Sequence, residues 1–278
     1  MIMAKISFGD DGSGANIAGF SFDFLQAYNS YAYHFSSISG YTDDNNRVSF
    51  TGDKLIYKGT DGGILLDPTQ QGKEMADIVG GAITSFTLIQ DGVQIFNMRD
   101  LRVSAAELYD AVMAGQNERI KDILLSGNDT IDGTKYDDVL QGRGGNDVLN
   151  GLAANDKLEG GLGADILTGG AGRDTFIYRS IAESTLEKAG QDTITDFRAS
   201  KTGDKISLSA IDANSTTAKN DAFHFIGTKA FGGHAGELRY EKTAANTYVY
   251  ADVNGDKVAD FAVHLDGALT LDKGYFVL

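Results

Sequence analysis

The stretch GGLGADILTGGAGRDTF, residues 160–176, decides the fold of this chain. It contains the unit G-G-x-G-x-D-x-U-x, where U is apolar, twice in succession. The nine-residue step runs back through the sequence and places six aspartates in one register. They are Asp129, Asp138, Asp147, Asp156, Asp165 and Asp174. Two residues beyond each aspartate stands an apolar residue: Ile131, Leu140, Leu149, Leu158, Leu167 and Phe176.

This nonapeptide is typical of parallel β-helices that bind calcium. Glycine permits a tight turn with positive φ and a close approach of carbonyl oxygens to an ion. The x-U-x triplet forms one short strand whose central side chain points inward, so that stacked turns build a narrow apolar column. Such a column buries too little surface to offset backbone ordering at ~1–2 kcal/mol per residue. Calcium, which takes about six to eight oxygen ligands, is expected to supply the missing stability.

One coil takes two nonapeptides, so aspartates on the same side of the roll are separated by two repeats, as in Asp129 with Asp147 and Asp138 with Asp156. The alternative, a flexible linker rich in glycine and aspartate, does not account for six repeats in register. Some repeats depart from the pattern. Tyr136 and Ala154 replace the fourth-position glycine, while Arg143 and Leu152 replace the second. The Asp138/Asp156 and Asp156/Asp174 sites are therefore expected to be weaker or distorted.

The composition favours cations as partners. The chain of 278 residues carries a net charge of −15, which argues against nucleic acid. Residues 127–176 alone hold nine acidic and four basic residues, so without calcium this tract should repel itself and stay disordered. The sequence has no cysteine and no apolar run long enough to span a membrane. Its polar start, MIMAKISFGDDGSG, makes a Sec-type signal peptide unexpected.

The fold class expected is all-β with a few short helices. Residues 1–103 alternate apolar residues around Gly and Asp turns, the clearest being Asp91-Gly92, and predict a β-rich domain. The aromatic segment 20–35 fits either a helix or two strands.

Residues 104–126 predict a helical cap for the roll, with a capping box at Ser104–Glu107 and a second helix from Glu118 to Leu125. Residues 127–178 form the calcium-bound parallel β-roll. A second capping box, Ser180–Glu183, predicts a short helix at the start of residues 179–278, a C-terminal β-sheet unit for secretion.

The motifs from residue 127 onward resemble, in this order, the calcium-binding C-terminal domain of serralysin-type secreted metalloproteases and related RTX proteins. After the repeats come DTFIYRSIAES, DTITDF, DKISLS, AFHFIGTKAFGGHAGELRY, DVNGDKVADF and the terminal YFVL. The resemblance implies that the chain leaves the cell through an ABC-transporter-based type I secretion system that reads an uncleaved C-terminal signal. It also implies that the roll folds outside the cell, where calcium is abundant.

The resemblance further implies the metal ligands, several calcium ions each taking carbonyls and an aspartate from two turns that lie two repeats apart. On one side these are Gly142, Gly144 and Asp147; Gly151, Ala153 and Asp156; Gly160, Leu162 and Asp165; and Gly169, Ala171 and Asp174, with Asp138 paired to Asp156. Opposite them lie Gly127 with Asp129, Gly145 with Asp147, and Gly161 and Gly163 with Asp165.

The protease activity of that family is excluded, because no H-E-x-x-H motif is present to hold zinc. The four histidines, His34, His224, His234 and His264, do not pair at the required spacing. No serine nucleophile elbow, phosphate loop or cysteine nucleophile is found either. We therefore name no catalytic residue and do not expect an enzyme, although an enzyme stays open as the alternative.

Three further groups are weaker candidates. Asp252, Asn254, Asp256 and Asp260 place oxygens at positions 1, 3, 5 and 9, like the front of a calcium loop, or form a polar hairpin turn. His34, among tyrosines, could bind haem as in secreted haemophores, the same aromatics could stack on sugar rings, or the set is part of a domain core. The pairs Asp10/Asp11 and Asp43/Asp44 could serve glycoside chemistry but are usually solvated.

The leading hypothesis is a secreted, calcium-folded RTX protein without enzymatic activity that binds a polysaccharide or protein at the cell surface or in the matrix. The rival hypothesis is a small secreted enzyme whose active site lies in residues 1–103. A third is haem capture, which predicts a Soret band that His34→Ala weakens.

Overall fold

The computed structural model of this chain describes residues 5–8, 30–34, 37–43, 46–58, 77–90, 93–104, 107–108, 110–111, 114 and 116–278. The described residues fall into two compact units that divide between residues 130 and 131. The first is a sheet with short helical segments, and the second contains the roll.

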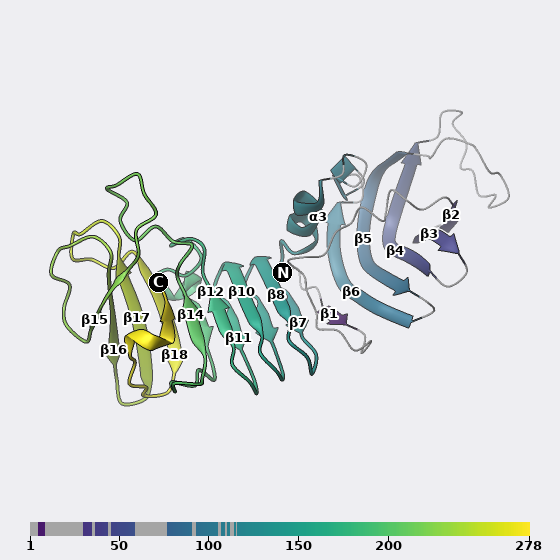
Figure 1. Cartoon of the computed structure of the whole chain (residues 1–278). Coiled ribbons are helices and arrows are strands. Elements are labelled where there is room, and N and C mark those ends of the chain that lie inside the picture. The colour runs from purple at the N-terminus through teal and green to yellow at the C-terminus, as the bar shows by residue number, and fades with distance from the viewer. Residues whose placement is uncertain are drawn as a thin grey trace. The chain divides into compact units, whose positions relative to one another are not determined.

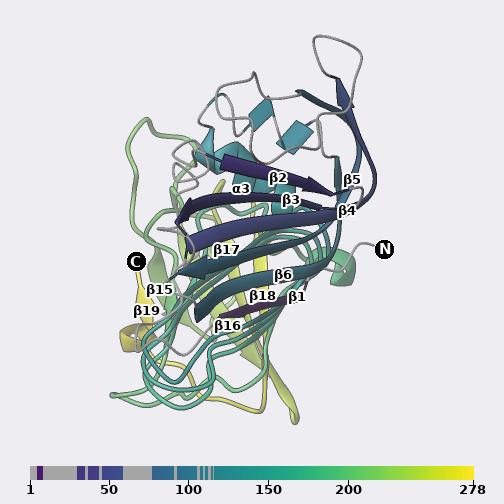
Figure 2. The ribbon, with the colours of Figure 1, turned by 90° about the vertical axis from the view of Figure 1, so that its right-hand side faces the viewer.

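Six strands of the first unit form one antiparallel sheet in the order β1-β6-β5-β4-β3-β2, as Figure 2 shows. The predicted β-rich character of this region is confirmed, and so is the hairpin around Asp91-Gly92. There Gln90 pairs with Val93, although the two turn residues lie outside the described ones. Of the aromatic segment 20–35, residues 30–34 form a strand. The strands are β1 (Lys5–Phe8), β2 (Ser30–His34), β3 (Ser37–Asp43), β4 (Asn46–Lys58), β5 (Asp77–Gln90) and β6 (Val93–Ser104).

The predicted helical segment begins with the expected cap. The backbone N–H of Glu107 donates to Ser104 Oγ at 3.3 Å, which is half of a capping box. The second predicted helix is α3 (Asn117–Leu124), which begins one residue before the predicted start and ends one residue before the predicted end. Ile120 and Leu124 are buried while Glu118 and Arg119 are exposed, so this helix is amphipathic.

The repeats form a parallel β-roll, and this fold prediction is confirmed. Leu140 pairs with Leu158 and Leu158 with Phe176 along one sheet, while Leu149 pairs with Leu167 along the other. All of these apolar side chains are fully buried. The stacked coils can be followed in Figure 1. Their strands are β7 (Thr130–Asp132), β8 (Val139–Gly144), β9 (Val148–Asn150), β10 (Lys157–Leu162), β11 (Ile166–Thr168) and β12 (Thr175–Ile177).

The roll extends beyond residue 178, its expected end. Ile194 pairs with Leu167, and Ile206 pairs with Phe176, so that two strands without a nonapeptide repeat continue the two sheets. Leu265 and Phe276 follow them in the same register. These strands are β13 (Thr193–Ile194), β14 (Lys205–Ser207), β18 (Phe261–Asp266) and β19 (Phe276–Val277). The C-terminal region therefore completes the roll and belongs to the same compact unit.

Three more strands extend the edge of one sheet in the order β18-β17-β16-β15. β16 and β18 run antiparallel to β17, and β15 runs parallel to β16. Their inward residues, including Leu238, Val249 and Val263, are fully buried, which gives this region a broader apolar core than the repeats have. The strands, predicted from their alternating pattern, are β15 (His224–Gly227), β16 (Glu237–Lys242) and β17 (Asn246–Asp252).

The helix predicted from the second capping box is absent. Residues 181–184 form turns and bends, followed by a short 3-10 helix η1 (Lys188–Gly190). The Glu183 carboxylate accepts the N–H of Arg179 at 2.9 Å, outside the box, and Ser180 Oγ accepts the N–H of Ala182. The box residues thus close a turn. A second 3-10 helix, η2 (Lys273–Tyr275), precedes the last strand.

Candidate metal centre

The six aspartates of the repeats lie inside the roll, each at most 2 % exposed. Their local sequence explains this placement, since each precedes the inward apolar residue of a short strand by two positions. A buried carboxylate is costly unless it is paired, hydrogen-bonded or bound to a cation. The roll therefore concentrates negative charge where it needs compensation.

One carboxylate oxygen of Asp156, of Asp165 and of Asp174 ties a coil to its neighbour. Asp156 Oδ1 accepts the N–H of Asp138 at 2.8 Å, and Asp174 Oδ1 accepts the N–H of Asp156 at 3.0 Å. On the other side of the roll, Asp165 Oδ1 accepts the N–H of Asp147 at 2.8 Å. The predicted pairing of aspartates two repeats apart is thus present in the backbone contacts.

The second oxygen is left for another partner. Asp156 Oδ2 and Asp165 Oδ2 are buried and accept no hydrogen bond. Leaving such an atom unsatisfied costs the desolvation penalty of the group. These two oxygens are suited to a hard cation, which prefers carboxylate and carbonyl ligands.

Carbonyl oxygens from the next coil converge on the same places. A Cβ on Gly142 would lie 2.2 Å from Asp147 Oδ2 and 2.5 Å from the carbonyl oxygen of Gly160. A Cβ on Gly151 would lie 2.3 Å from Asp156 Oδ2 and 2.6 Å from the carbonyl oxygen of Gly169. The first glycine of the repeat therefore keeps open a space that is lined by oxygens of two coils.

The second and fourth glycines keep a further set of carbonyls accessible. A Cβ on Gly163, whose φ is +141°, would lie 1.9 Å from the carbonyl oxygen of Gly145. A Cβ on Gly161, whose φ is +103°, would lie 2.2 Å from the carbonyl oxygen of Arg143. The glycine requirement at these two positions is steric as well as conformational.

Three of the residues that replace pattern glycines keep the glycine-like backbone. Arg143, Leu152 and Ala154 have φ values of 72°, 74° and 81°, in the left-handed region. An L-residue pays about 1–2 kcal/mol for this conformation. Tyr136 does not adopt a positive φ. The expected distortion at these repeats therefore takes the form of backbone strain at three positions and a different turn at Tyr136.

The electrostatics of the roll favour a bound cation or a proton. The pKa of Asp156 is raised to about 7, mainly by burial and also by the charges of Asp138 and Asp174, while the N–H of Asp138 opposes the shift. Burial likewise raises the pKa of Asp165 to about 6. A positive ion between the coils would relieve both the desolvation and the mutual repulsion.

The remaining predicted ligands would act through their main chains. Ala153 and Ala171 face each other across a parallel bridge between neighbouring coils, whereas the side chain of Leu162, at the end of β10, is 56 % exposed. Across the described residues, no three His, Cys, Asp or Glu side chains are placed to share a metal ion. The expected calcium ligands are therefore carbonyl oxygens together with single aspartates, as the family resemblance implies.

Sequence reasoning missed two members of the aspartate ladder, Asp192 and Asp204. Asp192 Oδ1 accepts the N–H of Asp165 at 2.9 Å, and Asp204 Oδ1 accepts the N–H of Asp174 at 3.0 Å. Burial and the charge of Asp165 raise the pKa of Asp192 to about 9. The signal that could have found them is the Asp-x-apolar triplet, which survives in Asp-Thr-Ile and Asp-Lys-Ile after the glycines are lost.

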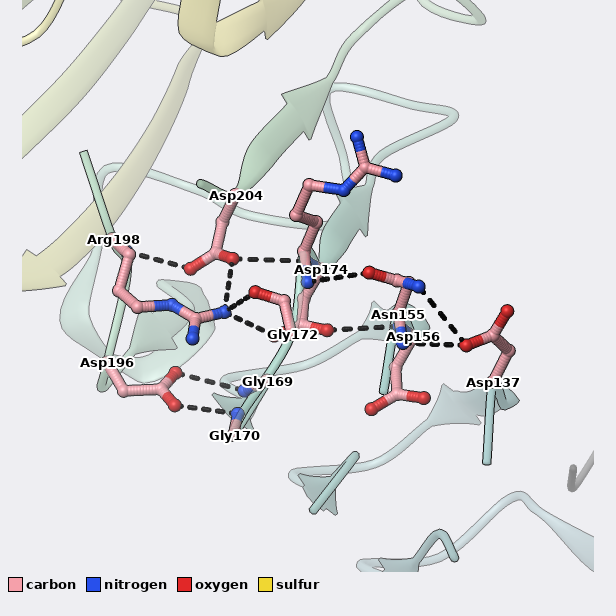
Figure 3. Close-up of polar contacts among 11 residues, drawn as sticks. Asp137, Asn155, Asp156, Gly169, Gly170, Gly172, Asp174, Asp196, Arg198 and Asp204 are labelled. Atoms are coloured by element: carbon pink, nitrogen blue, oxygen red, sulfur yellow. Dashed lines mark hydrogen bonds and ion pairs between the residues drawn. The ribbon is translucent and has the colours of Figure 1, made fainter. Parts of the chain in front are cut away.

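A parallel ladder runs along the fifth position of the repeats (Figure 3). Asp137 Oδ1 accepts the N–H of Asn155 at 2.8 Å, and Asn155 Oδ1 accepts the N–H of Arg173 at 3.0 Å. These bonds align the turns that present the carbonyl oxygens, so they stabilise the coil spacing without using the ladder aspartates.

The loop of Asp252, Asn254, Asp256 and Asp260 is closed by its own hydrogen bonds. The fully buried Asp252 accepts the N–H groups of Gly255 at 2.6 Å and Lys257 at 2.9 Å. Asp260 Oδ2 accepts the N–H of Val253 at 2.8 Å. This pattern accounts for the loop as a polar turn, and a calcium ion here stays a prediction.

The other weak candidates lie mostly outside the described residues. His34 ends β2 and pairs with Ser37, while Asp43 ends β3, but the positions of their side chains are outside the description. Asp10, Asp11 and Asp44 also lie outside it. None of the helices in the described part of the chain is long and apolar enough to cross a membrane.

Similar solved structures are bacterial repeat modules. The AlgE6R3 subunit of the Azotobacter vinelandii mannuronan C5-epimerase is 26% identical, with a TM-score of 0.40, covering 55% of this chain and 78% of its own. The AlgE6R2 subunit of the same enzyme is 28% identical, with a TM-score of 0.35, covering 54% of this chain and 92% of its own. The comparison with curated proteins gave no match.

The family comparison covers residues 131–277 of the second unit of the fold. Residues 125–277 match the model described as peptidase M10 serralysin C terminal. The match includes the repeats, the two missed aspartates and the terminal strand, and it spans more than half of the 278 residues. This chain therefore belongs to the serralysin C-terminal family.

Proposed function

We propose that this chain is a secreted protein whose roll binds several calcium ions and folds on them outside the cell. The observation that carries the proposal is the pair of buried, unsatisfied oxygens Asp156 Oδ2 and Asp165 Oδ2, each in a ladder that links adjacent coils. A cation supplied by the medium would satisfy them. The ligands proposed are the carbonyls and aspartates of the repeats named above.

A calcium titration of the full chain tests this proposal. Far-ultraviolet circular dichroism should show a gain of β signal with a midpoint around ~10⁻⁴–10⁻³ M, the range of extracellular calcium modules. Asp165→Asn removes the charge with little change of shape and should raise the midpoint at least about tenfold, equivalent to about 1.4 kcal/mol. Asp122→Asn, the same change at an exposed residue before the roll, is the control. A roll that forms fully in a calcium chelator would refute the proposal.

We further propose that a type I secretion system exports the chain through its C-terminal region. Membership of the serralysin C-terminal family supports this route. Expression in a bacterial host with and without a type I exporter would test it. The chain should reach the medium at its full mass only when the exporter is present, and full-length chain released without the exporter would contradict the route.

For the first unit we propose a binding role, with a polysaccharide or protein ligand at the cell surface or in the matrix. The support is the lack of a recognisable catalytic motif in the sequence. A glycan array probed with the full chain should give multivalent binding without turnover. Product formation that is lost on substituting one acidic residue among residues 1–103 would instead favour an enzyme.

A further inference from the structure

In the aspartate ladder, we call each pair of aspartates from neighbouring coils a step. The last step, from Asp174 to Asp204, contains a positively charged side chain, that of Arg198. Arg198 Nη2 donates to Asp204 Oδ1 at 2.9 Å and to the carbonyl oxygen of Gly172, and it lies 3.3 Å from Asp174 Oδ2. The backbone N–H of Arg198 also donates to Asp204 Oδ2 at 2.7 Å. Figure 3 shows the guanidinium pointing into the space between these groups.

The oxygens around Arg198 are equivalent to those of the step before it. Gly172 and Asp174 occupy the same repeat positions as Ala154 and Asp156, and Asp204 bonds to the N–H of Asp174 as Asp174 bonds to that of Asp156. The difference lies in the second carboxylate oxygen. Asp156 Oδ2 accepts no hydrogen bond, whereas Asp174 Oδ2 faces Arg198.

A cation of the protein itself offsets part of the negative charge of this step. Asp174 and Asp204 are both 1 % exposed, and a guanidinium stays protonated throughout the physiological range. Hydrogen bonding to Asp204 raises the pKa of Arg198, which keeps the charge in place. Arginine also suits a site with several oxygens, because its planar group presents donors in a fixed fork.

The neighbours of Arg198 hold it at this position. The Asp196 carboxylate accepts the N–H groups of Gly169 at 2.9 Å and Gly170 at 2.7 Å (Figure 3). The Phe197 ring is buried between Phe176, at a centroid distance of 6.2 Å, and Tyr275, at 6.5 Å. The triplet Asp196-Phe197-Arg198 therefore contacts the preceding coil at three places. Asp196 binds its turn, Phe197 packs on its apolar column and Arg198 pairs with its aspartate.

We propose that Arg198 takes the place of a calcium ion at this step, so that the Asp174/Asp204 step closes without calcium and presents a formed edge to the repeats. The inference rests on the proposed function, because it assigns calcium to the steps from Asp138 to Asp174 and excludes it from the next one. If Arg198 formed only a structural salt bridge, its replacement would not change the number of calcium ions bound.

The test is the number of calcium ions bound by the full chain, measured by native mass spectrometry or isothermal titration. Arg198→Met removes the charge and most of the polar contacts, and should bind one more calcium ion than the wild type. Arg198→Lys keeps a cation there and should bind the wild-type number. Arg179→Met is the matched control, because it removes an arginine whose ion pair, with Glu159 at 2.7 Å, involves no aspartate of the ladder. An unchanged ion count in Arg198→Met would overturn the inference.

Hydrogen exchange of the wild type in a calcium chelator gives a second readout that needs no variant to fold. The amide of Asp174, bonded to Asp204, should stay protected, while the amides of Asp138 and Asp147 should exchange freely. Equal and fast exchange at all three positions would overturn the inference. If the wild type binds no calcium at all, the proposed function fails instead, so the two failures are distinguishable.

Discussion

The repeat coils, residues 131–176, and the later coils built by β13, β14, β18 and β19 form the same two apolar columns with different means of support. The repeats bury a single large apolar residue per strand and surround it with glycines and buried carboxylates, of which Asp156 and Asp165 each leave one oxygen without a hydrogen bond. The later coils add a broad apolar layer, with Val249, Phe261 and Val263 fully buried, and the half-buried Arg198. One architecture can thus be stabilised by an external ion or by its own side chains.

The largest effect is expected from weakening the column where it is narrowest. Leu149→Ala removes a fully buried side chain and should cost about 2–5 kcal/mol in saturating calcium, measured by urea unfolding. Leu152→Ala makes the same change at a residue that is 53 % exposed, and it should stay within about 0.5 kcal/mol of the wild type. Equal costs for the two variants would show that calcium alone holds the repeats together.

A second way to sharpen the comparison is to fill the space between two coils. Gly163→Ala would place a Cβ 1.9 Å from the carbonyl oxygen of Gly145, and overpacking of this kind should cost about 1–3 kcal/mol. Gly144→Ala is the control, because its Cβ would meet nothing within 4 Å. The calcium midpoint and the urea midpoint should both move for Gly163→Ala alone. If both variants behave alike, the close approach of the coils is not needed for the site.

The pH dependence should report on the buried carboxylates of the repeat coils. The pKa values of Asp156, about 7, and Asp165, about 6, lie above their ordinary value of 3.8, so protonation stabilises the calcium-free fold. That contribution is fully present below about pH 4 and is lost as the pH rises through about 6–7.

In a chelator, the repeats should therefore gain β signal when the pH falls from about 8 to about 5. The calcium concentration at the midpoint should rise as the pH falls, by up to about tenfold per pH unit, because protons compete with the ion for the carboxylates. Asp156→Asn should reduce both responses. A chelated chain whose circular dichroism is constant over this range would contradict the assignment of the raised pKa values.

The smallest effect is expected from relieving strain. Leu152 has a φ of 74°, and Leu152→Gly removes a penalty of about 1–2 kcal/mol at the expense of about 0.5–1 kcal/mol of chain entropy. A net gain of about 0.5–1 kcal/mol should appear as a higher urea midpoint. Leu162→Gly makes the same change at an exposed leucine without a positive φ and should destabilise the roll. Loss of stability in both variants would mean that the Leu152 turn is not strained.

The comparison also explains what could be predicted from the sequence. The step of nine residues specifies the coils, the columns and the pairing of aspartates across neighbouring coils, because each property repeats with the same period. Past Phe176 the glycine pattern and the pairing distance both change. Asp165 pairs with Asp192 over 27 residues and Asp174 with Asp204 over 30, in place of the 18 residues between paired repeat aspartates, so extending the repeat pairing does not reach them. Arg198 was not predictable, since its role depends on three groups that only the coiled backbone brings together.

The sequence separation between paired strands affects the order in which the coils fold. Neighbouring repeat coils join residues 18 apart, as Asp147 joins Asp165, whereas Thr193 and His264 join across 71 residues. Closing the longer loop costs about 1.2 kcal/mol more, because the chain entropy penalty grows by about 0.6 kcal/mol per doubling of length. Local contacts also form faster than distant ones. If the roll folds on calcium as proposed, the joining of neighbouring repeat coils is therefore expected to be faster than the joining of β13 to β18.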